Sequence, residues 1–330
     1  MSVLATMMGV ATLALGVLAA PLSVEAQQPG KIARVGRLSP VSATADARNL
    51  EALRQGLRDL GWVEGQNIAY EDRFAEGRPD RLPDLAAELV RLKVDVVFAG
   101  STPAALAAKN ATATTPVVMV MGGDPVASGL VASLARPGGN LTGVTALYQE
   151  LSAKRLDLLK EAVPGVTRVA VLSNPAFPDS GPSVKGVESA ARALGVQLRV
   201  LPVRDPTEFE KAFAAMRSER ARALMVLPDI MFNTHRRRIV ELTAKSRLPA
   251  IYGLREFVDA GGLMFYGAPL PDMWRRAAYY VDRILKGAKP ADLPVEQPMR
   301  FEMVINMKTA KALGIKFPQS ILMRADQVIQ

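Results

Sequence analysis

Short apolar runs alternate with amphipathic segments along most of this chain. The amphipathic segments carry leucines three or four residues apart, as at Leu50, Leu53 and Leu57, which is the spacing of one helix face. Strands that alternate with helices favour parallel sheets, so the pattern predicts an α/β fold. The apolar runs, which we interpret as buried strands, cover residues 31–38, 68–74, 94–98, 116–121, 168–172, 196–202, 223–227, 249–252 and 302–306.

Two segments separate the predicted elements into groups. Residues 135–145 are rich in glycine and proline and have no helical period, and residues 262–267 lie between two predicted helices, so we place the crossings between two lobes there. The order of elements in 193–229 also repeats that in 59–101, which favours two similar lobes. The sequence predicts two doubly wound parallel-sheet lobes joined by a hinge. Their expected bounds are 31–145 with about 267–300, then about 146–266, and a hinge-returning C-terminal segment, 301–330.

The end of the apolar run 94–98 has the residues of an anion-binding junction. Ser101 and Thr102 are favoured helix caps, and the proline after them suits the first helical turn. The unpaired N–H groups of that turn would face the carboxyl edge of the sheet, where a carboxylate or phosphate can bind. A capped helix that holds no ligand is the alternative. Asp124 followed by Pro125 predicts a second junction of strand, cap and helix.

Charge and composition exclude several classes of function. The net charge of +9 comes from Lys and Arg dispersed among acidic residues, which favours a solvated basic surface and no nucleic-acid partner. The one histidine, His235, is followed by three arginines and is expected on an exposed helix surface. The sequence has no acidic pair at metal-ligand spacing, no serine elbow and no phosphate-binding loop. We therefore expect no metal, no cofactor and no catalytic residue.

The first 26 residues have the pattern of a signal peptide. Residues 3–20 are apolar and uncharged, and the small-residue pattern Val24-Glu25-Ala26 precedes Gln27. No Lys or Arg precedes the apolar run, which leaves open whether Met1 is the true start. The chain contains no cysteine, so it has neither disulfides nor a cysteine for a lipid anchor. These features predict a periplasmic protein.

Polar side chains follow most of the predicted strands at their carboxyl ends. Those ends meet at one edge of a parallel sheet, where ligands bind, so together the side chains predict a ligand-binding cleft between the lobes. Each one taken alone has the alternative of a cap or turn residue. The candidates are Ser39, Ser101, Thr102, Asp124, Asn174 and Asp229, with Tyr252 and Tyr266 close by.

The chain resembles the substrate-binding proteins of ABC transporters. Specifically, it is similar to the family that includes tryptophan- and phenylalanine-type binders with the type I periplasmic binding fold. The resemblance covers nearly all of the mature chain. It is carried by LRQGLRDLGWVEGQNI (53–68), AEGRPDRLPDLAAELV (75–90), GSTPAALAAK (100–109), GDPVASGLVASLARPGGNLTG (123–143), KRLDLLKEAVPGVTRVAVLSNP (154–175) and EFVDAGGLMFYG (256–267).

The resemblance implies a protein that binds a small carboxylate-bearing solute, an amino acid or a related compound, and delivers it to an ABC permease at the inner membrane. We expect a monomer. The carboxylate would lie at Ser101 and Thr102, and an ammonium group, if the ligand has one, would pair with Asp229. Members of the family often carry Asp-Asn where this chain has Asp229 and Ile230, so only the role of the aspartate is transferred.

Two other functions remain as alternatives. The first is an α/β enzyme acting on a small anionic substrate with Asp124 or Asp229 as its base. The second is the effector domain of a transcription regulator, which the export signal and the lack of a helix-turn-helix segment oppose. The partner of Asp229 is also open. An arginine of the protein, in place of a ligand ammonium group, would stabilise its buried charge and make Asp229 a structural residue.

Overall fold

The computed structural model describes residues 32–330, so the predicted signal peptide, residues 1–26, lies outside the described residues. Two sheets form the framework, with strand orders β2-β1-β3-β4-β5 and β12-β11-β10-β9-β8-β6-β7. The first sheet contains β1 (Ala33–Ser39), β2 (Ile68–Phe74), β3 (Val96–Ala99), β4 (Val117–Met121) and β5 (Leu141–Thr145). The second contains β6 (Arg168–Ser173), β7 (Gln197–Pro202), β8 (Ala223–Val226), β9 (Ala250–Tyr252), β10 (Met264–Gly267), β11 (Glu302–Asn306) and β12 (Gln327–Ile329).

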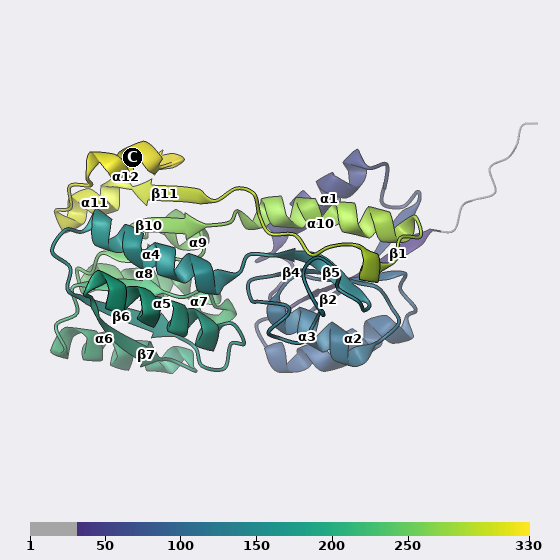
Figure 1. Cartoon of the computed structure of the whole chain (residues 1–330), viewed down its shortest axis with the longest axis horizontal. Coiled ribbons are helices and arrows are strands. Elements are labelled where there is room, and N and C mark those ends of the chain that lie inside the picture. The colour runs from purple at the N-terminus through teal and green to yellow at the C-terminus, as the bar shows by residue number, and fades with distance from the viewer. Residues whose placement is uncertain (1–31) are drawn as a thin grey trace, which may run out of the picture. The chain divides into compact units, whose positions relative to one another are not determined.

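Helices connect the strands and cover the sheets (Figure 1). Within residues 32–330, every strand pair is parallel except β10 with β11, which confirms the predicted α/β class with parallel sheets. None of the helices in this range is long and apolar enough to cross a membrane. The helices are α1 (Ala47–Asp59), α2 (Leu82–Arg91), α3 (Thr102–Ala111), α4 (Tyr148–Ala162), α5 (Ser180–Leu194), α6 (Phe209–Ser218), α7 (Ile230–Thr234), α8 (Arg236–Lys245), α9 (Glu256–Asp259), α10 (Leu270–Leu285), α11 (Met307–Leu313) and α12 (Gln319–Arg324).

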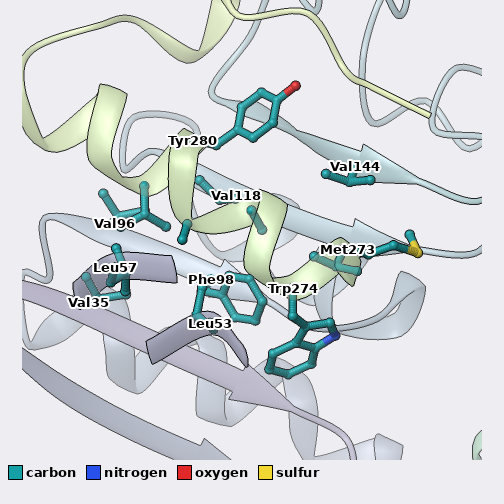
Figure 2. Close-up of a cluster of buried hydrophobic side chains, with 14 of the residues drawn as sticks. Val35, Leu53, Leu57, Val96, Phe98, Val118, Val144, Met273, Trp274 and Tyr280 are labelled. Carbon is teal, nitrogen blue, oxygen red and sulfur yellow. The ribbon is translucent and has the colours of Figure 1, made fainter. Parts of the chain in front are cut away.

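The first sheet has a core to which α10 contributes, although α10 follows the second sheet in the sequence (Figure 2). Phe98 of β3 and Trp274 of α10 are both buried, and their ring centroids lie 4.7 Å apart. Leu53 and Leu57 of α1 are buried in the same core. We call the first sheet with α1, α2, α3 and α10 lobe 1, and the second sheet with the remaining helices lobe 2.

Both segments that were predicted as crossings between lobes contain a strand. Residues 141–145 form β5, which pairs with β4, and residues 264–267 form β10, which pairs with β9 and β11. Gly143 has a φ of +140°, and a Cβ atom there would lie 2.1 Å from the carbonyl oxygen of Met119, so both the backbone conformation and the packing require glycine. The glycine in this segment therefore lets two backbones approach within a sheet.

The helix predicted to begin at Pro125 does not form. Residues 125–129 form turns, and Oδ1 of Asp124 accepts hydrogen bonds from the N–H groups of Val126 and Ala127 at 2.8 and 3.1 Å. Asp124 makes the same hydrogen bonds to the following N–H groups in this turn as it would at the start of a helix. The local sequence therefore does not distinguish a turn from a helix here.

Candidate ligand-binding site

A pocket lies where the carboxyl ends of the strands of both lobes come together. From lobe 1 it is lined by residues that follow β1, β3 and β4, and from lobe 2 by residues that follow β6, β8 and β9. Its aromatic lining consists of Tyr148, Phe177 and Trp274. Its polar lining consists of Asp46, Asn49, Ser101, Thr102, Asp179, Asp229, Asn233 and Glu256. The pocket thus lies at the edge of the sheets where the sequence predicted a cleft.

The start of α3 contributes the lobe 1 side of the pocket. Ser101 is the N-cap, and its Oγ accepts a hydrogen bond from the N–H of Ala104 at 3.2 Å. At Gly100 a Cβ atom would lie 2.5 Å from the indole of Trp274, so only glycine lets the strand end pass beneath that ring. The helix start and the indole therefore share one wall of the pocket.

Asp229 contributes the facing lobe 2 side, at the start of α7. Its Oδ1 accepts a hydrogen bond from the N–H of Phe232 at 2.8 Å, and its Oδ2 accepts one from Nδ2 of Asn174 at 2.9 Å. Burial raises the pKa of Asp229, and these hydrogen bonds oppose the rise. No arginine within residues 32–330 forms an ion pair with Asp229, so the structural alternative of an arginine partner is not seen in the described chain.

Thr102 and Asp179 connect the two lobes directly. Oγ1 of Thr102, in lobe 1, donates a hydrogen bond to Oδ2 of Asp179, in lobe 2, at 2.7 Å, and both residues are buried. Burial raises the pKa of Asp179 to about 6, and the hydrogen bond from Thr102 partly opposes this. The hydroxyl of Thr102 is therefore already engaged, which leaves Ser101 and the backbone of the first α3 turn to meet an anion.

Raising the pH is expected to weaken the contribution of Asp179 to the folded, closed state. The folded-state pKa of Asp179 is about 6, which lies above the ordinary value of 3.8. The contribution of Asp179 to stability is therefore fully present below pH 3.8 and is lost as the pH rises through 6. Urea unfolding of the wild type and Asp179→Asn, from about pH 4 to about pH 7, tests this. The stability of the wild type relative to the variant should fall across that range; a constant difference would show that Asp179 does not titrate there.

Five of the residues predicted from the sequence lie outside the pocket lining: Asn174, which donates to Asp229, and Ser39, Asp124, Tyr252 and Tyr266. Ser39 donates a hydrogen bond to Oδ2 of Asp46 at 2.5 Å and so supports a lining residue. Asp124 caps the turn described above. Tyr252 is fully buried and stacks on Phe257 with ring centroids 4.7 Å apart. The backbone carbonyl of Tyr266 accepts a hydrogen bond from Nε of Arg155 at 2.7 Å.

The structure places the other candidates at the pocket. Ser101, Thr102 and Asp229 line the pocket, and Asn174 holds Asp229. Sequence reasoning did not find Asp46, Tyr148, Asp179, Glu256 or Trp274, because it considered only polar residues directly after strands, whereas these residues lie in helices or next to helix starts.

Comparisons with known proteins agree with this geometry. A family model described as "ABC transporter substrate binding protein" matches residues 34–329. A tyrosine-binding protein of Clostridioides difficile (strain R20291) is 27% identical over 280 residues, which is 84% of this chain and 80% of that protein.

Solved structures give the same result. The structure of a conserved domain protein from Vibrio cholerae superposes with a TM-score of 0.85 at 27% identity, covering 90% of this chain and 100% of that chain. The structure of an ABC domain from Streptococcus pneumoniae in complex with L-Trp superposes with a TM-score of 0.84 at 28% identity, covering 90% of this chain and 99% of that chain. The expected type I periplasmic binding fold and the resemblance to amino-acid binders are thereby confirmed.

Proposed function

Since this chain belongs to the ABC transporter substrate-binding proteins, we propose that it binds an amino acid or a related carboxylate between its lobes and delivers it to a permease. The observation that carries the proposal is the pocket itself, with the capped start of α3 on one lobe and Asp229 on the other. An α-amino acid has an ammonium group and a carboxylate group attached to the same carbon. Asp229 can pair with the ammonium group, and the start of α3 can bind the carboxylate. The aromatic lining fits a solute with an apolar portion.

Binding would proceed by closure of the lobes on the solute. The carboxylate would accept hydrogen bonds from Ser101 and from the first N–H groups of α3, where the helix dipole favours an anion. The ammonium group would lie at Asp229. Because such a ligand contacts both lobes, it binds the closed state preferentially and shifts the population towards it. The solute would leave unchanged, because the proposed role is binding without catalysis.

Thermal unfolding in the presence of amino acids tests the proposal. A solute that binds the folded state at 100 times its Kd adds about 2.7 kcal/mol to stability and so raises Tm. We expect at least one α-amino acid to raise Tm, and its decarboxylated amine to raise it far less, because the amine lacks the group that α3 receives. No change in Tm with any amino acid would contradict the proposal.

Replacing Ser101 by alanine should separate binding from stability. The variant loses a helix cap worth about 1 kcal/mol of stability and a hydrogen bond to a charged group worth about 1.5 to 3 kcal/mol of affinity. Calorimetric titration and urea unfolding should therefore show a larger loss in affinity than in stability. Asn306→Ala is the matched control, because Asn306 caps α11 away from the pocket and should change stability alone.

We further propose that the chain is exported and acts as a monomer outside the cytoplasm. The support is the signal-peptide pattern of residues 1–26 and the family of the chain. Expressed from Met1, the protein should be recovered from the periplasm with Gln27 as its first residue, as N-terminal sequencing would show. An intact N-terminus, or retention in the cytoplasm, would contradict the proposal.

A further inference from the structure

Every charged side chain that lines the pocket is a carboxylate. The four are Asp46, Asp179, Asp229 and Glu256, and no Lys, Arg or His of the described chain joins them in the lining. The chain as a whole has the opposite balance, with 41 basic and 32 acidic residues. One ammonium group of an amino acid needs only one of these carboxylates, so the charge of the pocket exceeds what the proposed function requires.

Protein donors already meet three of the carboxylates but leave part of Glu256 unmet. Ser39 and Asn49 donate to Asp46. Asn174 and Phe232 donate to Asp229, and Thr102 donates to Asp179. Oε2 of Glu256, by contrast, is buried and has no hydrogen-bond partner within residues 32–330. A buried carboxylate oxygen without a donor is costly, so a cationic group of a ligand that reached it would stabilise the closed pocket.

Asp46 lines the same pocket as Glu256, but from the other lobe. It precedes α1 in lobe 1, whereas Glu256 begins α9 in lobe 2, and both line the pocket. Burial raises the pKa of Asp46, hydrogen bonds from Ser39 and Asn49 oppose the rise, and the negative charge of Glu256 adds to it. Both carboxylates line the same pocket from different lobes, and a cation between them would offset the unfavourable effect of the Glu256 charge on Asp46.

The other charges near Glu256 lie outside the pocket lining. Burial raises the pKa of Glu256, Asp259 adds to the rise, and Arg236 and Arg48 oppose it. Arg48 is exposed, and Nη1 of Arg236 donates to the carbonyl of Asn233 at 2.8 Å. Neither arginine forms an ion pair with Glu256 in the described part of the chain. They reduce the cost of the buried charge without occupying its free oxygen.

We propose that Asp46 and Glu256 form a subsite for a second cation, so that the solute is an amino acid whose side chain ends in an ammonium or guanidinium group. This inference rests on the proposed function, because Ser101 and Asp229 are already assigned to the α-carboxylate and α-ammonium groups. The rings of Tyr148 and Trp274 would pack against the aliphatic part of such a side chain.

Calorimetric titration with matched ligands tests the subsite on the wild-type protein. L-Arginine and L-citrulline have nearly the same shape but differ in charge, and L-norleucine is L-lysine without its terminal ammonium group. The charged member of each pair should bind about 10- to 100-fold more tightly. Equal affinities within each pair would overturn the inference. So would tight binding of L-tryptophan alone, which would leave the proposed function standing, whereas binding of no amino acid would remove the proposed function itself.

The variant Glu256→Gln tests the residue assignment. It should bind L-arginine about 10- to 100-fold more weakly than the wild type does, and it should lose far less affinity for the uncharged L-citrulline. Glu188→Gln, which neutralises an exposed glutamate of α5, is the control and should change neither affinity. If Glu256→Gln weakened both ligands equally, Glu256 would be structural, and the subsite would not exist.

Discussion

Replacing Trp274 by alanine should lower the free energy of unfolding by about 3 to 5 kcal/mol, the range for removing a large aromatic side chain from a core. Trp274 is 2% exposed, contacts Phe98 at a ring-centroid distance of 4.7 Å, and packs over Gly100. Its removal would leave a cavity between α10 and the sheet of lobe 1. Because the indole also lines the pocket, affinity should fall as well.

Urea unfolding without ligand would measure this loss, and Trp62→Ala provides the comparison. Trp62 is the other of the two tryptophans in the chain. It is partly exposed, and its Nε1 donates a hydrogen bond to Oδ1 of Asp282 at 2.9 Å. Its replacement should cost less stability and leave ligand affinity unchanged, because Trp62 is not part of the pocket lining. Equal losses for the two variants would show that Trp274 is not central to the core of lobe 1.

The variant Asp229→Asn should weaken the binding of an α-amino acid by roughly 2 to 5 kcal/mol, the range for removing one partner of a buried charge pair. Asparagine is as good a helix cap as aspartate, so α7 should keep its start and the fold should be preserved. The same substitution should weaken the binding of the deaminated analogue, which lacks the α-amino group, far less. In the proposed binding mode, the carboxylate of Asp229 contacts the ligand only through that ammonium group.

Two ligand pairs allow this measurement by calorimetry: L-arginine with 5-guanidinopentanoate, and L-tryptophan with indole-3-propionate. Asp205→Asn is the control variant, because Asp205 caps the short helix Pro206–Glu208 and lies outside the pocket. Equal losses for the amino acid and its deaminated analogue would assign Asp229 a structural role, and the ammonium group would then have to bind elsewhere.

The fold was largely predictable because local signals and burial agree along most of the chain. The run 168–172 is followed by a polar loop, and it forms the buried strand β6. Ser101 was predicted as a cap from its position before a proline, and its Oγ does accept the N–H of Ala104. Such features depend on neighbours in sequence, which the sequence displays directly.

The features that were missed depend on contacts between distant residues. Leu141 and Val144 are buried in β5 only because β4 lies alongside, and the glycines before them resemble a loop. Asp179 stands before α5 like any polar loop residue, and its importance comes from Thr102, 77 positions away. Glu256 likewise lines the pocket together with residues of the other lobe. No periodicity within one segment carries this information.

The most direct test of the central claim is mass spectrometry of the small molecules released when the purified protein is denatured. The claim is that the lobes hold an amino acid and return it unchanged. We predict release of an intact amino acid, which the refolded protein binds again and does not consume during prolonged incubation. Recovery of a chemically altered product, or failure to bind any amino acid after refolding, would contradict the claim.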